Sequence, residues 1–188
     1  MLAIVMIIGA VLLRLLPHLP NFAPITAMGL FGGKYITNKF AIFVPLVALI
    51  VSDYLLLYVN PFTMHADFSH IYPISAMFHA TTFYVWGSFV FSSLIGIWLR
   101  KTKRPEVILG ATVGASLQFF LITNFGVWAA GAYSRGIEGL LQSYLMGLPF
   151  LKFTLLGDLF YTGVFFGAYA LATHLAKRPT VQLATHEA

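Results

Sequence analysis

The sequence predicts an all-α integral membrane protein, a bundle of six transmembrane helices. Of its 188 residues, 59% are hydrophobic and only 9% are charged, and the mean hydropathy is +0.85. Soluble domains carry roughly 25% charged residues. A span needs about 20 apolar residues, so this length allows five or six spans and no sizeable soluble domain. We expect a single transmembrane domain over residues 1–176 and a polar cytoplasmic tail over residues 177–188.

Three features of the composition narrow the class further. Residues 1–13 lack a basic start and a small-residue cleavage site, so they predict a retained helix and not a signal peptide. The chain has no cysteine, which excludes disulfides and thiolate metal ligands. Its net charge of +5 is expected to reflect membrane topology and not a nucleic-acid partner.

The first half of the chain predicts three membrane segments. Residues 2–16 form the first span, and residues 40–59 form a strong third span that Ser52-Asp53 interrupts. Between them, residues 22–33 are too short to cross perpendicularly. We expect a short or partly re-entrant second helix, which is tolerated where protein covers it or where it lines a cavity.

The second half predicts three more spans and two long outer loops. The expected segments are a loop over 60–78, a span over 80–99, a basic loop over 100–104, a span over 107–130, an amphipathic connection over 133–150 and a span over 153–173. Gly110 and Gly114 are four residues apart, which predicts a helix-packing face on the fifth span.

Basic residues predict the topology. With the N-terminus inside, eight basic residues fall on the inner side (Lys34, Lys39, Arg100, Lys101, Lys103, Arg104, Lys177 and Arg178) and three on the outer side (Arg14, Arg135 and Lys152). The positive-inside rule then places both termini in the cytoplasm.

This topology gathers the intramembrane polar residues in the outer half of the bilayer. At a rise of about 1.5 Å per residue, Asp53 and Asn124 lie in the outer halves of their spans, and Asp158 lies just inside the outer end of the sixth. Arg14, His18 and Asn21 follow the outer end of the first span, and His79 precedes the fourth. The sequence therefore predicts a pocket between helices that opens outward beneath the two long loops.

Each candidate residue has a possible ligand role and a structural alternative. The candidate substrate-binding residues are Asn21, Asp53, His79, Trp86, Asn124, Trp128 and Asp158, with Arg14 and His18 as charge partners. Alternatively, the carboxylates pair with Arg14 or Lys152, Asn124 bonds a neighbouring helix, and the tryptophans belong to interfacial belts. Intramembrane carboxylates are commonly functional.

Metal binding has weak candidates only. His65, Asp67 and His70 lie in one loop, but their spacing is a weak metal pattern without a helical context. His79, at the mouth of the expected pocket, is a possible cobalt ligand. No resident metal or cofactor is expected.

Several short motifs together resemble a known family. They are Arg14–His18, Pro20–Pro24, Gly29–Gly33, Val44–Leu46, Ser52-Asp53, His79 with Trp86–Phe89, Thr123–Trp128 and Gly157–Leu159. Their order resembles a family of small bacterial transport-type proteins, itself similar to the substrate-binding (S) components of energy-coupling-factor (ECF) vitamin transporters. Some members of the wider group are solitary cobalamin carriers.

The resemblance implies a six-helix protein of the bacterial inner membrane that binds a small vitamin-like substrate from outside for uptake. Cobalamin or a related cofactor precursor is the substrate we expect, with His79 in place of a cysteine on the cobalt. The first helix has no clear Ala-x-x-x-Ala docking motif, so the partner is either an ECF-type energising module or none.

Two other classes stay open. One is a non-transporting membrane subunit or scaffold, in which the polar groups pair with each other. The other is a metal-dependent membrane enzyme. The sequence has no hydrolase or nucleotide-binding motif, so we expect no enzyme activity.

Overall fold

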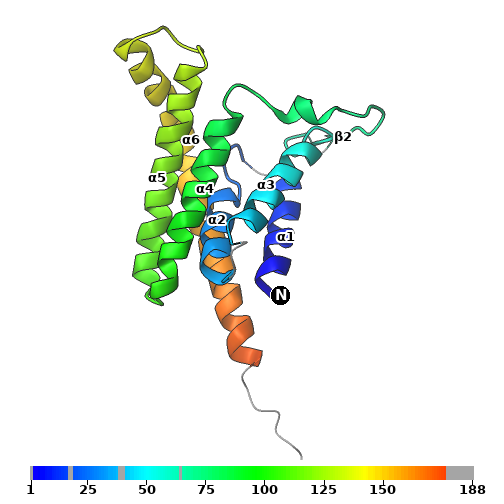
Figure 1. The fold of residues 1–188 in the computed structure, drawn as a ribbon, viewed down its shortest axis with the longest axis vertical. Helices are drawn as coiled ribbons and strands as arrows, with labels where there is room; N and C mark the ends of the chain where they lie inside the picture. Colours follow the sequence, from blue (N-terminus) through cyan, green and yellow to red (C-terminus); the bar gives the residue numbers. More distant parts are fainter. Residues whose placement is uncertain (1, 17–18, 38–40, 64, 177–188) are drawn as a thin grey trace, which may run out of the picture.

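The computed structural model describes residues 2–16, 19–37, 41–63 and 65–176 (Figure 1). They form six α-helices: α1 (Leu2–Leu15), α2 (Ile25–Tyr35), α3 (Phe43–Leu55), α4 (Thr82–Trp98), α5 (Pro105–Ala129) and α6 (Ile137–Ala176). Shorter elements are the antiparallel pair β1 (Val59–Asn60) and β2 (His65–Ala66) and the 3₁₀ turns η1 (Ile74–Met77) and η2 (Leu99–Lys101). The mostly helical class that the composition predicts is confirmed.

Three helical segments are long and apolar enough to cross a membrane: Thr82–Lys101, Pro105–Ala129 and Ile137–Ala176. They identify the chain as a membrane protein. The other three helices have 14, 11 and 13 residues, fewer than the roughly 20 that a perpendicular span needs. Length alone therefore supports three spans, although the six helices run alternately up and down (Figure 1).

The basic α4–α5 connection lies at the same end of the molecule as the start of α1 and the end of α6 (Figure 1). The long connection between α3 and α4 lies at the opposite end, as does the α5–α6 turn. The basic connection therefore lies at the same end as the start of α1 and the end of α6, as the predicted topology requires. Which end faces the cytoplasm stays a prediction.

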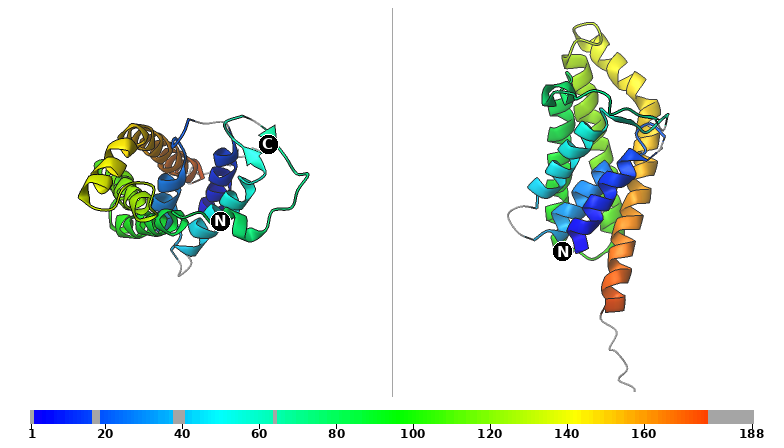
Figure 2. Two further views of the ribbon diagram at one scale, coloured as in Figure 1. Left: turned by 90° about the horizontal axis from the view of Figure 1, so that it is seen from above. Right: turned by 90° about the vertical axis from the view of Figure 1, so that its right-hand side faces the viewer.

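The short helix α2 is at the centre of the bundle. Every residue from Thr26 to Lys34 is buried, and the helix packs against α4 and α6 and also against α1 and α3. Viewed from above, α2 lies between the α4–α5–α6 group and the α1–α3 pair (Figure 2). Since protein covers it on all sides, α2 needs no span-length apolar surface.

Glycines let α2 and α4 approach closely. A Cβ added to Gly33 of α2 would lie 2.1 Å from the carbonyl oxygen of Ser93, and one added to Gly96 of α4 would lie 2.4 Å from that of Leu30. The expected packing face at Gly110 and Gly114 is wrong, because a Cβ at either would meet nothing within 4 Å. Small residues therefore build the α2–α4 contact, whereas Gly110 and Gly114 make no contact for α5.

Two basic side chains fasten the lower end of α2 to α4. Lys34 Nζ donates to the carbonyl oxygens of Leu99, at 2.5 Å, and Thr102. Arg100 returns the contact, with Nε 2.8 Å from the carbonyl oxygen of Gly33 and an Nη donating to that of Ile36 at 2.6 Å. Carbonyls left free at helix ends are commonly capped by basic side chains in this way. These residues therefore have a structural role besides their effect on topology.

Replacing Arg100 with alanine is expected to lower the free energy of unfolding by about 1–2 kcal/mol, because two charge-assisted hydrogen bonds are lost. Arg104→Ala is the matched control. Within the described part of the chain, the Arg104 side chain pairs with Glu106 at the exposed surface, so its loss is expected to cost less than about 1 kcal/mol. Denaturant titration of the purified protein in mixed micelles measures both, and equal effects would contradict the capping role.

The largest difference from the sequence prediction lies in α6. Residues 133–150 are not a second long outer loop, because α6 begins at Ile137 and continues for 40 residues with Pro149 inside it. The helix bends along its course (Figure 2) and does not end at the proline. Of the two connections predicted on the outer side, the second is therefore a short turn between Ala129 and Ile137. The first is long, as expected.

Candidate functional site

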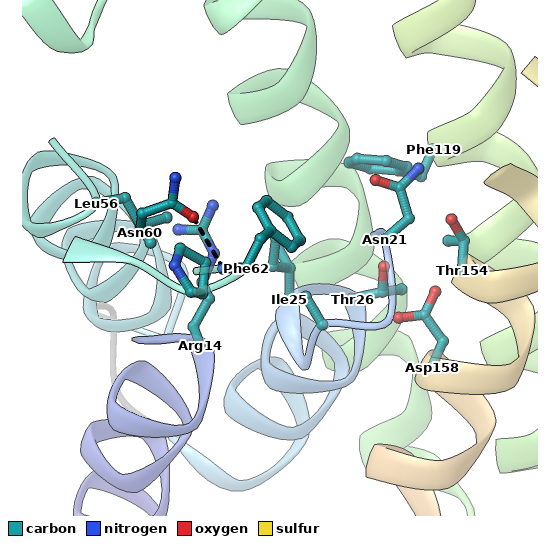
Figure 3. Close-up of a pocket in the computed structure, with 12 residues that line it drawn as sticks. Arg14, Asn21, Ile25, Thr26, Leu56, Asn60, Phe62, Phe119, Thr154 and Asp158 are labelled. Carbon is teal, nitrogen blue, oxygen red and sulfur yellow. Dashed lines mark hydrogen bonds between the residues drawn. The ribbon is translucent and has the colours of Figure 1, made fainter. Parts of the chain in front are cut away.

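One cavity lies where α1 ends and α2 begins, against α5 and α6. We call it chamber A; its volume is about 360 Å³. Its lining residues are Arg14, Asn21, Ala23, Ile25, Thr26, Leu56, Asn60, Pro61, Phe62, Phe119, Thr154 and Asp158. Figure 3 shows Asp158, Thr26, Thr154 and Asn21 on one side of the chamber, Arg14 and Asn60 on the other, and Phe62 between them.

A second cavity, chamber B, adjoins the first and has a volume of about 240 Å³. The two share Asn21, Phe119 and Thr154 in their linings. Chamber B extends from there between α5 and the upper part of α6, along Asn124 and Gly147. Together they form a hollow between the helices in which a few polar groups lie among apolar walls.

Asp158 is the most enclosed charged residue of the site, with 2% of its surface exposed. The Ser116 hydroxyl on α5 lies 2.6 Å from its Oδ2, and the Thr26 hydroxyl on α2 also bonds its carboxyl group. Gly157 allows this position, because the backbone of Phe22 and Ala23 lies within 3.0–3.3 Å of where a Cβ would stand. Asp158 therefore joins α2, α5 and α6 at the wall of chamber A.

Arg14 reaches chamber A from the end of α1, and residues of α3 hold its guanidinium group. Its guanidinium pairs with Asp53 at 2.6 Å and also bonds the Ser52 hydroxyl. The second oxygen of Asp53 accepts a hydrogen bond from Trp86 Nε1 at 3.0 Å. Asp53 and Trp86 thus position Arg14, and neither lines a chamber.

Asn21 and Asn124 are both brought to the chambers. Asn21 lies between the two chambers. Its backbone is in the left-handed conformation (φ 62°), which asparagine tolerates better than most residues. Asn124 lines chamber B. Its amide nitrogen donates to the Phe120 carbonyl oxygen at 2.8 Å, and its side chain lies against Gly147, where a Cβ would come within 2.3 Å of Oδ1.

Other candidates lie outside both chambers. His79 is exposed, with Nδ1 3.0 Å from the Thr81 hydroxyl, just before α4. Trp128 donates from Nε1 to the Ser134 carbonyl oxygen at 3.2 Å, at the end of α5. His18 lies outside the described residues.

The described residues contain no group of three His, Cys, Asp or Glu side chains that could hold a metal ion. His65, Asp67 and His70 are exposed on the α3–α4 connection. Ser69 bonds two of them: its backbone nitrogen donates to Asp67 at 2.8 Å, and its hydroxyl lies 2.7 Å from His70 Nδ1. The hydrogen bonds from Ser69 hold the pKa of Asp67 below its usual value.

Sequence reasoning missed several lining residues. Thr154 is one helical turn before Asp158, and this i, i+4 spacing could have placed it on the same face. Thr26 and Ser116 touch Asp158 from other helices. Phe62 comes from an irregular loop, where no periodicity predicts which side chain borders a cavity.

The fold and the site define a helical membrane protein with a cavity between its helices that several polar side chains line. The chain belongs to the family of unknown function DUF6580, whose sequence profile matches residues 1–181. No curated protein and no solved structure is significantly similar to it.

Proposed function

We propose that this protein binds a small vitamin-like molecule from the outer face of the bacterial inner membrane and takes part in its uptake. The observation that carries the proposal is chamber A. It lies among several helices, has polar side chains on opposite walls and has aromatic rings in Phe62 and Phe119. Small-molecule sites in helix bundles typically combine apolar walls with a few placed polar groups.

The resemblance to ECF S components supports the same proposal at the level of architecture. In it, the six helices cross in alternation, with both termini in the cytoplasm and α2 as the short, protein-covered pass. The α3–α4 connection then covers the outer mouth of chamber A, to which it contributes Asn60, Pro61 and Phe62. The energising partner is an ECF-type module or none.

The volumes narrow the substrate class. Chambers of about 360 and 240 Å³ lie at or below the low end of the roughly 300–1,000 Å³ typical of ligand pockets. They suit a molecule of one or two rings with polar substituents. Cobalamin is larger than a drug-sized ligand and needs the chambers to widen, so a smaller cofactor precursor is the substrate we favour.

Mass spectrometry of small molecules retained by the purified protein tests this proposal. Thr154→Val is expected to reduce retention about tenfold, because one lost hydrogen bond to a buried ligand weakens binding by about 1.4 kcal/mol. Thr173→Val is the matched control on the same helix, outside both chambers. His79→Ala is expected to leave retention unchanged. A wild-type protein that retains nothing under mild extraction would contradict the proposal.

A non-transporting scaffold is the second candidate, and a specific observation favours it. The polar groups satisfy one another: Arg14 pairs with Asp53, and Asp158 bonds Ser116 and Thr26. A metal-dependent enzyme has no assembled metal site among the described residues to support it.

Cysteine accessibility separates a binding protein from a scaffold, because the chain has no native cysteine. In the binding protein, a thiol at Thr154→Cys is expected to react with a membrane-impermeant maleimide added from outside, since chamber A opens to that side. Lys101→Cys is expected to react only after permeabilisation. An unreactive thiol at position 154 in both conditions would favour the scaffold.

A further inference from the structure

The charge of Asp158 has no counterion among the described residues. Their ion pairs are Arg14–Asp53 and Arg104–Glu106. Arg14 is the charged side chain that shares chamber A with Asp158, and Asp53 already balances it. A carboxylate enclosed in a membrane bundle is costly unless a cation or a proton neutralises it.

Oxygen atoms surround this carboxyl group. Ser116 and Thr26 bond it directly, and Thr154 and Asn21 line the same side of chamber A (Figure 3). On its own helix the nearest titratable group is Tyr161, whose ring packs against Phe22. Hard oxygen donors with one carboxylate suit a small monovalent cation, and carboxylates within membrane bundles serve in the ion and proton pathways of pumps and transporters.

The proton count at Ser116 favours a proton on Asp158. Its Oγ lies 2.6 Å from Asp158 Oδ2 and 3.0 Å from the Thr112 carbonyl oxygen. A serine hydroxyl has one proton to donate. If Asp158 is ionised, both neighbours are acceptors and one contact lacks a proton. If Asp158 carries a proton, it donates to Ser116, which donates to Thr112, and both contacts are satisfied.

We propose that Asp158, with Ser116, Thr26, Thr154 and Asn21, forms a binding site for a monovalent cation, H⁺ or Na⁺, which enters through chamber A. Thr154 and Asn21 also line chamber B, so the ion shares part of its surroundings with any molecule bound there. This last point rests on the proposed function: cation occupancy at Asp158 then couples to substrate binding. The cation site itself does not depend on that function.

Carbodiimide labelling tests the site in the wild-type protein without knowledge of the substrate. Dicyclohexylcarbodiimide is a hydrophobic reagent that modifies protonated carboxyl groups, and peptide mass spectrometry reads the labelled position. In the alkaline part of the profile, the labelling rate of Asp158 is expected to fall about tenfold per pH unit, because the protonated fraction falls by that factor. Asp53 in the same digest is the control, and its pairing with Arg14 predicts little labelling.

Comparing the labelling rates in two salts identifies the ion. At fixed pH and ionic strength, slower labelling in NaCl than in choline chloride identifies Na⁺, whereas equal rates with a clear pH dependence identify H⁺. Asp158→Asn is expected to remove the labelled peptide. Labelling of Asp158 that ignores both pH and Na⁺, or no labelling at any pH, would overturn the proposal. Ligand retention is a separate measurement, so failure of the proposed uptake function is distinguishable from failure of the cation site.

Discussion

Replacing Arg14 with leucine is expected to lower the free energy of unfolding by about 3–5 kcal/mol, because Asp53 then remains as an unpaired charge inside the bundle. The two side chains are 12% and 20% exposed, so water replaces the lost partner poorly. The same change removes the hydrogen bond to Ser52 between α1 and α3. Denaturation in mixed micelles, followed by tryptophan fluorescence, measures the loss and also reports on Trp86, which bonds Asp53.

The double variant Arg14→Leu/Asp53→Leu is the matched control. Removing both charges leaves none unpaired, so it is expected to be more stable than Arg14→Leu alone. If the stability losses of Arg14→Leu and Asp53→Leu instead sum to that of the double variant, the two side chains are not coupled. The pair then does not hold α1 against α3 in the way the structure indicates.

Gly33→Ala is expected to cost about 3 kcal/mol or to prevent folding, because its new methyl group would enter the α2–α4 contact. The atoms it meets are the carbonyl oxygen of Ser93 and the Cα of Gly96, at 2.1 and 2.9 Å, and neither can rotate away as a side chain can. The two helices must separate, and α2 has neighbours on its other faces. Yield of folded protein and its denaturation midpoint measure the effect.

Gly110→Ala and Gly114→Ala are controls for which the expected change in stability has the opposite sign. Open space surrounds both positions on α5, and alanine favours a helix over glycine by about 0.5–1 kcal/mol. Both variants are expected to be as stable as the wild type or slightly more stable. A loss of stability at Gly110 would indicate that a partner covers this face of α5.

The composition predicts that this is a membrane protein, but it does not predict all of the helix contacts. Its low charge content indicates a membrane protein, and the short 22–33 segment predicts a covered helix, both of which the structure bears out. The two glycine pairs, Gly29/Gly33 and Gly110/Gly114, have identical spacing. Which pair makes a contact depends on the facing helix, where Ser93 and Gly96 supply small residues for the first.

The site shows the same limit. The structure brings Arg14, Asn21 and Asp158 to one cavity, but Asp158 lies in the middle of the 40-residue α6 and not near a helix end as expected. The Arg14–Asp53 pair is the structural alternative that the sequence left open for Asp53. The hydrogen bond from Trp86 to Asp53 was not predicted, because it depends on how α3 and α4 are rotated about their axes. The continuous α6 was missed because a proline inside a helix bends it at least as readily as it ends it.

The short helices give the molecule unequal hydrophobic thickness around its circumference. The 13 residues of α3 rise about 20 Å, whereas the 25 residues of α5 rise about 38 Å. Ile8 and Leu12 of α1 and Val47 and Val51 of α3 are exposed, so the thin side has an apolar surface. A hydrocarbon layer of about 30 Å matches neither side, and each ångström of mismatch costs a fraction of a kcal/mol. In the proposed six-span arrangement, the bilayer is therefore expected to thin beside α1 and α3 and to bring bulk water closer to the α1–α2 junction than a uniform membrane would.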